Sequence, residues 1–298
     1  MEVLAHVFDP PFRLSRPSGP LAPVIVNSPH SGAIYPEPFL KSVRLDAHSL
    51  RRSEDAFVAE LFAAAPALGA PLLEACFPRA FLDVNREPWE LDPAMFEGAL
   101  PPYANTSSIR VAAGLGTIAR VVSENEEIYS RKLSLAEAEA RILQLYFPYH
   151  AALGRLIDDM HAHFGSVLLL DCHSMPTSAA ASGLSQPGHR PDVVLGDRHG
   201  SACSGIITAA LESLLTAQGL KVARNRPYAG GFITQTHGKP RLGRHAIQIE
   251  ICRSLYMDET SLAKTEGFEA LRATMTNVMQ ALFASLAPVL VPATLAAE

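Results

Sequence analysis

The chain has few cysteines and few charges for its 298 residues, and each shortage excludes a class of protein. Its four cysteines, Cys76, Cys172, Cys203 and Cys252, lie far apart without a C-x-x-C pair, which excludes a zinc knuckle and a disulfide framework. Charged residues make up 18%, and 25 basic against 30 acidic side chains leave a net charge of −5. Because phosphate binding needs clustered Lys and Arg, we expect no nucleic-acid partner.

Long hydrophobic runs are also missing. No segment approaches the roughly 20 apolar residues of a membrane span, so we expect no membrane partner. The first residues, Met1 to Leu4, lack the basic start and apolar stretch of a signal peptide, which predicts a cytoplasmic location. Hydrophobic residues nevertheless make up 48%, enough for a sizeable core, which excludes a mainly disordered chain.

Strand-like and helix-like segments alternate along the chain. Short β-branched and apolar runs predict strands at 24–27, 80–84, 167–170, 192–195, 221–223 and 246–251. Apolar spacing predicts helices at 53–65, at 134–163 with a break at Pro148, at 204–217 and at 261–287. Residues 174–191 are small and polar and predict a long loop. This alternation predicts an α/β fold with helices on both faces of a mostly parallel sheet, and sites where strands end.

Two histidines follow predicted strands and suggest a metal site. His30 comes after 24–27, and His173 comes after 167–170. A catalytic zinc binds His nitrogens and a carboxylate and keeps one position for water, so Glu54 or Asp55 would complete the set. The simpler alternative is that both histidines are hydrogen-bonded loop residues and that the two acids sit in the first turn of a helix capped by Ser53. The residues alone leave both readings open.

Glu250 lies within the apolar run 246–251. Alternation places it on the same face as Gln248, opposite three isoleucines. A carboxylate in such a strand is costly unless it has a partner, so it is either catalytic or paired with Arg253 or Arg244. No G-x-S-x-G occurs, so a serine hydrolase is not supported. The G-x-G-x-x-A run at 114–119 lacks strand–turn–helix context and predicts a glycine turn instead.

Ordered blocks between about residues 24 and 259 resemble the N-formylglutamate amidohydrolase family. The blocks are Val26-Asn27-Ser28-Pro29-His30-Ser31-Gly32, Glu54-Asp55-Ala56-Phe57-Val58, Leu82-Asp83-Val84-Asn85-Arg86-Glu87-Pro88, Leu170-Asp171-Cys172-His173-Ser174-Met175-Pro176, Leu195-Gly196-Asp197-Arg198, Gly230-Gly231-Phe232-Ile233-Thr234, His237-Gly238-Lys239-Pro240 and Gln248-Ile249-Glu250. Single blocks are weak signals, whereas the ordered set is specific.

The resemblance implies a fold and a metal. The family is similar to zinc carboxypeptidases and aspartoacylases, which implies one three-layer αβα domain over residues 1–298 around a mostly parallel mixed sheet. It implies one Zn²⁺, or another divalent metal, on His30, Asp55 and His173. Asp55 is preferred to Glu54 because the family block has an acid followed three residues later by Val, here Val58. Zinc carboxypeptidases carry their first His and acid close together, whereas 24 or 25 residues separate them here, so Glu54 stays an alternative.

The resemblance also implies an activity, the hydrolysis of N-formyl-L-glutamate to formate and L-glutamate, in histidine breakdown. Glu250 would take the proton of the attacking water. An acidic N-acyl amino acid would be bound by a set of polar residues: Arg86, Asn85, Arg253, Arg198 and Thr234. One alternative is a zinc deacylase or carboxypeptidase-like amidase for another N-acyl amino acid or small peptide. Another is a non-catalytic binder of an acidic metabolite. The oligomeric state is not predicted.

Overall fold

The structure is a computed structural model that describes residues 7–122, 126–182 and 190–290. Contacts divide the chain into two compact units. The first comprises Met1–Arg13, Pro29–Ala56 and Glu74–Ala152, and the second comprises Leu14–Ser28, Phe57–Leu73 and Leu153–Glu298. The expectation of one domain over 1–298 therefore stays a prediction.

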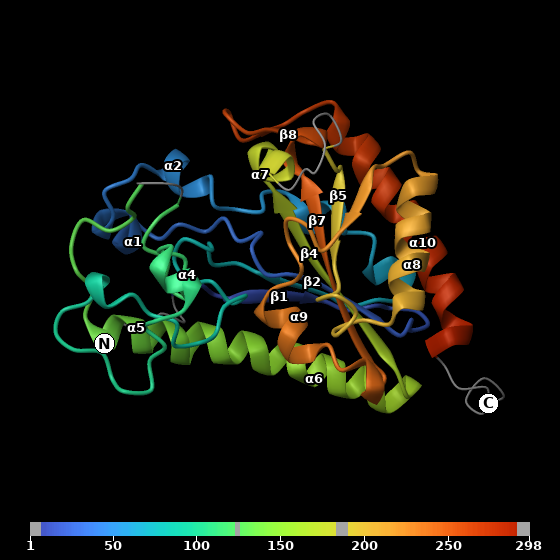
Figure 1. The fold of residues 1–298 in the computed structure, drawn as a ribbon, viewed down its shortest axis with the longest axis horizontal. Coiled ribbons are helices and arrows are strands. Elements are labelled where there is room, and N and C mark those ends of the chain that lie inside the picture. Colours follow the sequence, from blue (N-terminus) through green and yellow to red (C-terminus); the bar gives the residue numbers. More distant parts are fainter. Residues whose placement is uncertain (1–6, 123–125, 183–189, 291–298) are drawn as a thin grey trace. The chain divides into compact units, whose positions relative to one another are not determined.

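A seven-stranded sheet has the order β1-β3-β2-β4-β7-β5-β6 (Figure 1). Its strands are β1 (Phe12–Ser15), β2 (Val24–Ser28), β3 (Leu72–Ala75), β4 (Val167–Met175), β5 (Val193–Gly196), β6 (Val222–Arg224) and β7 (Arg244–Cys252). β2, β4 and β7 run parallel, β5 pairs antiparallel with β7, and β6 runs parallel to β5. The prediction of a mostly parallel α/β sheet is confirmed.

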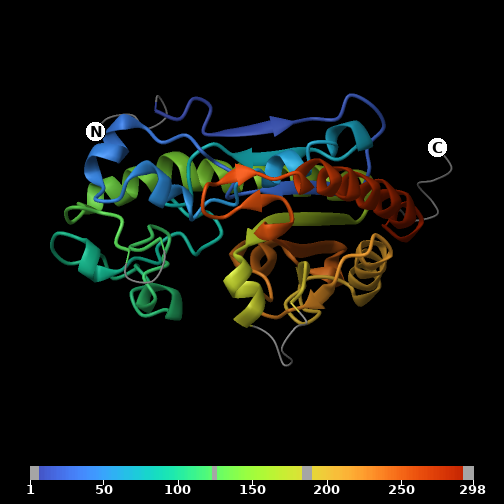
Figure 2. The same ribbon diagram turned by 90° about the horizontal axis from the view of Figure 1, so that it is seen from above.

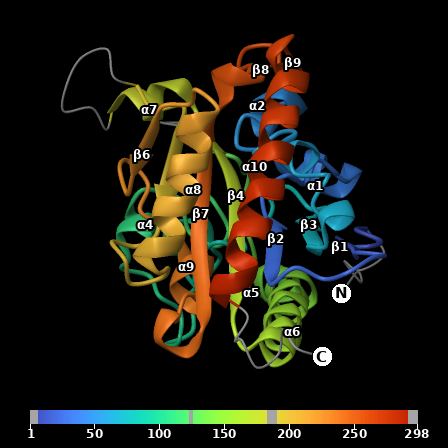
Figure 3. The same cartoon turned by 90° about the vertical axis from the view of Figure 1, so that its right-hand side faces the viewer.

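Helices lie on both faces of the strands within the second unit. They are α3 (Val58–Leu61), α7 (Thr177–Ser182), α8 (Gly205–Ala217), α9 (Phe232–His237) and α10 (Gly267–Leu290). α8 follows the cap Ser204 and buries the stripe Ile207, Leu211 and Leu215, the spacing of one helix face. α8 and α10 pack together on one side of the strands, and α9 packs against β7 and β4 on the other (Figures 1, 2 and 3). A small hairpin, β8 (Met257–Asp258) with β9 (Ala263–Lys264), precedes α10.

The first unit is made of short helices joined by long irregular segments. Its helices are α1 (Glu37–Ser42), α2 (Ala47–Arg51), α4 (Ile109–Ala112) and α5 (Leu135–Arg141). A capping box between Ser134 and Glu137 begins α5. The chain then continues through a π-helical turn at Ile142–Tyr146 into α6 (Phe147–Phe164). The helical span is thus divided just before Pro148, by a π-helical turn rather than by a break at the proline itself, which lies in the first turn of α6, where a missing N–H is tolerated.

Three predicted elements differ in the structure. Residues 53–57 form a turn and loop, and only α3 is helical in the predicted span 53–65, so the helix-capping explanation of Glu54 and Asp55 is wrong. Residues 80–84 form turns and loop rather than a strand. The last helix begins at Gly267, since the hairpin occupies the residues before it.

The predicted loop at 174–191 contains regular secondary structure. β4 runs on to Met175 and α7 follows it, while residues 183–189 lie outside the described part. None of the described helices is long and apolar enough to cross a membrane.

Candidate active site

His30 lies between two carboxylates in the first unit. Its ring is 1% exposed, with Nε2 2.8 Å from Asp83 Oδ1 and Nδ1 3.3 Å from Asp55 Oδ2. A neutral imidazole that donates Nε2–H to Asp83 presents the lone pair of Nδ1 to Asp55. Two electron-pair donors then face one another at short range, which is the arrangement that a cation between them would satisfy.

Asp83 is held in place by several neighbours besides His30. Arg79 Nε donates to Asp83 Oδ2 at 2.8 Å, and the backbone N–H of Asn85 donates to Oδ1 at 2.8 Å. Arg86 Nη2 lies 3.7 Å from Oδ2. Burial acts to raise the pKa of Asp83, but the charges of Arg79 and Arg86 and the contact with His30 hold it well below its usual range. Asp83 is therefore an anion that orients the ring of His30.

Asp55 and Glu54 point to different partners. Asp55 is 1% exposed, and its backbone N–H donates to the carbonyl of His30 at 3.0 Å, which holds its carboxylate beside the ring. Glu54 instead accepts from Arg51 Nε at 3.1 Å. Burial and the neighbouring charge of Glu54 raise the pKa of Tyr35. Of the two acids, Asp55 is the one within reach of His30 Nδ1.

Arg86 is positioned by backbone carbonyls. Its Nε donates to Leu115 O at 2.9 Å, and its Nη1 donates to Asn85 O at 3.0 Å. Tyr146 donates its hydroxyl to the Arg86 carbonyl at 2.7 Å. Burial lowers the pKa of Arg86, yet a guanidinium keeps its proton at physiological pH. Arg86 is thus a charged guanidinium whose orientation is set by protein contacts.

In the second unit, four polar side chains share one face of the sheet. The register places Asp171 beside Gln248 and His173 beside Glu250 on β4 and β7. Paired residues of neighbouring strands point to the same face of a sheet. Because side chains alternate between the two faces along each strand, Asp171 and His173 lie on the same face as Gln248 and Glu250. His173 lies within β4 rather than after a strand, because β4 is longer than its apolar part.

His173, like His30, lies beside a buried carboxylate. Its Nε2 lies 3.1 Å from Asp171 Oδ2, and Asp171 Oδ1 accepts from Asn27 Nδ2 at 2.8 Å. Asn27 belongs to β2 and stands opposite Asp171 in the sheet. Asp171 Oδ2 thus lies beside the ring of His173 without a hydrogen bond to it.

Glu250 is oriented by its neighbour two residues earlier. Gln248 Oε1 accepts from the Gly231 N–H at 2.7 Å, which fixes the amide so that Nε2 donates to Glu250 Oε1 at 2.6 Å. Arg244, one of the two expected salt-bridge partners of Glu250, pairs with Asp158 at 2.9 Å. It begins β7, while Glu250 lies near the other end of that strand.

The remaining predicted substrate residues lie in the second unit. Arg253 Nε donates to Ser174 Oγ at 3.1 Å, next to His173 in the chain. Arg198 Nη1 reaches Gly230 O at 3.4 Å, and Thr234 Oγ1 donates to Gly231 O at 2.9 Å. The hydroxyl of Thr234 thus binds its own helix start, and its contact with substrate stays a prediction.

The chemistry of these residues fits a divalent metal. Each histidine has one ring nitrogen on a buried carboxylate, the arrangement that orients metal-binding imidazoles in proteins. Two imidazoles and an Asp carboxylate are ligands that zinc accepts. A cysteine nucleophile is not favoured, since all four thiols are buried and free and burial raises the pKa of Cys203 to about 12.

Sequence reasoning gave no role to Asp83, Asp171 or Gln248. Asp171 had a usable signal, because it lies two residues before His173 in an apolar run and therefore on the same strand face. Gln248 had the same signal relative to Glu250. Nothing local links Asp83 to His30, which is 53 residues away.

Comparison with known proteins gives consistent results. Residues 22–257 match the family model described as N-formylglutamate amidohydrolase. A protein of Pseudomonas putida named N-formylglutamate deformylase is 27% identical over 80% of this chain and 83% of its own length. One of the same name from Pseudomonas aeruginosa is 26% identical, over 88% and 93%. The crystal structure of N-formylglutamate amidohydrolase from Ralstonia eutropha aligns with a TM-score of 0.87 at 37% identity, covering 92% of this chain and 98% of that chain.

Proposed function

The chain belongs to the N-formylglutamate amidohydrolase family, and from this membership we propose that it hydrolyses N-formyl-L-glutamate to formate and L-glutamate. The names of the two Pseudomonas relatives support this reaction. The observation that carries the proposal is the polar face of β4 and β7, where His173 stands beside a Glu250 oriented by Gln248. A positioned carboxylate next to a metal-binding imidazole is what water activation for amide hydrolysis requires.

We propose one Zn²⁺ held by His30, Asp55 and His173, with Glu54 not a ligand. Each of the three offers one ligand atom from a buried side chain. The strand pairing supports a metal site shared by His30 and His173. Asn27 of β2 pairs with Asp171 of β4, and His30 follows Asn27 by three residues while His173 follows Asp171 by two. Bound there, the metal would act as a Lewis acid that lowers the pKa of water and polarises the amide oxygen.

The protein groups have separate tasks in the proposed reaction. Glu250 accepts the proton of the water that attacks the formyl carbon, and then delivers it to the glutamate nitrogen as the C–N bond breaks. Gln248 keeps Glu250 aligned during both transfers. Asp83 orients the imidazole of His30 through a hydrogen bond, and Asp171 lies beside the ring of His173. Such positioning is effective because the groups need not reorganise during the reaction.

Substrate recognition is assigned to charged groups. Arg86 binds one substrate carboxylate in a bidentate manner, supported by Asn85, since its guanidinium is already oriented by two carbonyls. Arg253 or Arg198 binds the second carboxylate that a glutamate substrate carries. Thr234 lines the pocket from the start of α9.

The proposal also includes the setting of the reaction. Residues 1–298 would act as one functional domain in the cytoplasm. The four free thiols support a reducing compartment. Family membership supports a place in histidine breakdown.

The test is formate release from N-formyl-L-glutamate by purified protein. We expect turnover that a chelator abolishes and added Zn²⁺ restores. N-acetyl-L-glutamate and N-formyl derivatives of neutral amino acids serve as comparison substrates. Faster turnover of one of these would retain the reaction and change the substrate, whereas no turnover of any N-acyl amino acid by the zinc-loaded protein would refute the proposal.

A further inference from the structure

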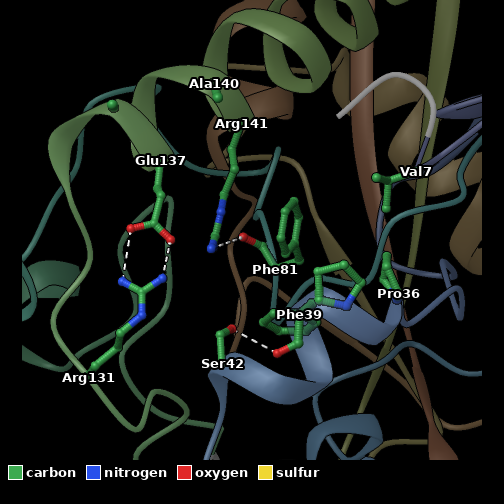
Figure 4. A pocket seen from close by; sticks show the side chains of 11 residues that line it. Val7, Pro36, Phe39, Ser42, Phe81, Arg131, Glu137, Ala140 and Arg141 are labelled. Carbon is green, nitrogen blue, oxygen red and sulfur yellow. Dashed lines mark hydrogen bonds and ion pairs between the residues drawn. The ribbon is translucent and has the colours of Figure 1, made fainter. Parts of the chain in front are cut away.

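A cavity of about 360 Å³ in the first unit is lined by a buried arginine that has no acidic partner among the described residues. Arg141, the last residue of α5, is 4% exposed and lines this cavity. Its Nη1 donates to Phe81 O at 3.1 Å and to Tyr129 Oη at 2.6 Å. In the described part of the chain no carboxylate forms an ion pair with Arg141, and neither its Nε nor its Nη2 donates a hydrogen bond. Figure 4 shows the guanidinium reaching from the helix toward the Phe81 carbonyl.

This arginine departs from the usual environment of buried charges. Arg is almost never this buried unless it is paired, because desolvating a charge is costly. The Phe81 ring, 4.0 Å from the guanidinium carbon, offsets part of that cost through a cation–π contact. The Phe81 ring and the two neutral oxygens do not neutralise the positive charge of Arg141. The cavity therefore contains a cation that an anionic ligand could pair with.

The other charges at the cavity are already matched. Arg131 pairs with Glu137 through two hydrogen bonds, of 2.7 and 3.0 Å. That contact with Arg131, followed by the backbone N–H of Ser134, lowers the pKa of Glu137 to about 2. Arg141 is therefore the one unmatched charge among the described residues that line the cavity, which favours a ligand with a single negative charge.

The rest of the wall is mostly apolar. It is formed by Val7, Pro36, Pro38, Phe39, Phe81, Ala136 and Ala140. Its one hydroxyl, that of Ser42, donates to Phe39 O at 2.8 Å and is thus occupied. A volume of this size holds a ligand of about ten non-hydrogen atoms. None of the lining residues is a proposed ligand or substrate contact of the active site.

We propose that this cavity binds an organic monocarboxylate with an apolar body. The carboxylate would accept hydrogen bonds from Arg141 Nε and Nη2, the paired geometry that a guanidinium offers. The apolar body would lie against Phe39, against Pro38 of α1 and against Pro36, which precedes this helix. This binding is separate from the proposed hydrolysis and does not depend on it.

The test uses 3-phenylpropionate as probe and 3-phenylpropionamide as its uncharged counterpart, with calorimetry on the full chain. We expect one molecule of the acid to bind with a Kd of about 1 mM or tighter. The amide should bind about ten-fold more weakly or worse, because it lacks the charge. Arg141→Met should weaken the acid by at least as much.

A second variant, Ala140→Leu, fills the cavity with a larger side chain and leaves Arg141 in place. It tests the proposal even if Arg141→Met fails to fold. It should abolish binding, while Ala151→Leu, the same change at an exposed position of α6 outside the cavity, should leave it intact. Circular dichroism checks that each variant is folded. Equal binding of acid and amide, unchanged binding by Ala140→Leu, or no binding of the acid at millimolar concentration would each overturn the proposal.

Discussion

Replacing Asp83 tests whether the carboxylate behind His30 contributes to metal binding. Asp83→Asn keeps the size and one acceptor oxygen, so the bond from His30 Nε2 can remain while its charge is lost. Asp83→Ala removes the bond itself. Either change also leaves Arg79 and Arg86 without their shared anion, which destabilises the fold. Zinc affinity must therefore be measured at a temperature where each variant is folded.

The expected magnitudes follow from the 2.8 Å contact between His30 and Asp83. A hydrogen bond to a charged partner contributes about 1.5–3 kcal/mol, and a neutral one about 0.5–1.5 kcal/mol. Losing the difference, about 1–1.5 kcal/mol, should raise the zinc Kd of Asp83→Asn about ten-fold. Asp83→Ala should raise it about a hundred-fold, the upper range for removing a carboxylate behind a metal-binding histidine.

The assay is competition for Zn²⁺ against a chromophoric chelator. Asp92→Asn is the matched control, because Asp92 also pairs with an arginine, Arg120, at 2.8 Å, but contacts no histidine among the residues that the structure describes. The control should bind zinc like the unmodified protein. If folded Asp83→Asn and Asp92→Asn bind zinc alike within about two-fold, Asp83 does not tune the metal site and the reasoning fails.

Three further variants separate the remaining roles. Glu250→Gln should lower kcat about 10²–10⁴-fold and leave the zinc Kd within about two-fold; retained turnover would remove Glu250 as the base. Asp55→Ala should lose bound zinc in a metal assay, whereas Glu54→Gln should keep it, and the reverse result would exchange the two acids. The pKa of Glu137 is about 2 in the folded protein, against an ordinary value of 4.5. Its carboxylate therefore contributes fully to the free energy of unfolding above pH 4.5, and this contribution is lost as the pH falls toward 2. Discounted for solvent screening, Glu137→Gln should cost about 1 kcal/mol in urea unfolding at pH 7, and an equal loss at pH 2 would contradict this.

Most strands were predictable because a buried parallel strand is a short run of apolar, β-branched residues. The same reasoning failed at 80–84, where Leu82 and Val84 are buried by loop packing rather than by strand pairing. The helix expected at 53–65 had a correct apolar pattern, but Phe57 takes a left-handed conformation with φ 64° and ends the turn that carries Asp55. Tertiary position overrode local propensity there.

Residue types for the site were readable from sequence, whereas their partners were not. His30, His173 and Glu250 stand out because polar groups are rare in or after apolar strands. Which carboxylate meets which imidazole depends on contacts across long separations, 53 residues for His30 and Asp83. The exception is His173 with Asp171, since strand alternation alone puts residues two apart on one face.

The orientation of Glu250 follows from a residue without a side chain. Gly196 on β5 stands opposite Gln248, and a Cβ there would lie 2.7 Å from the backbone nitrogen of Gly230. The absence of that carbon lets the glycine loop approach the sheet, with Gly230 at φ 118°, a conformation that side chains rarely adopt. Only at this approach does the next N–H, that of Gly231, reach Gln248 Oε1 and direct the amide Nε2 toward Glu250. The glycines therefore determine which atom of Gln248 faces the carboxylate of Glu250.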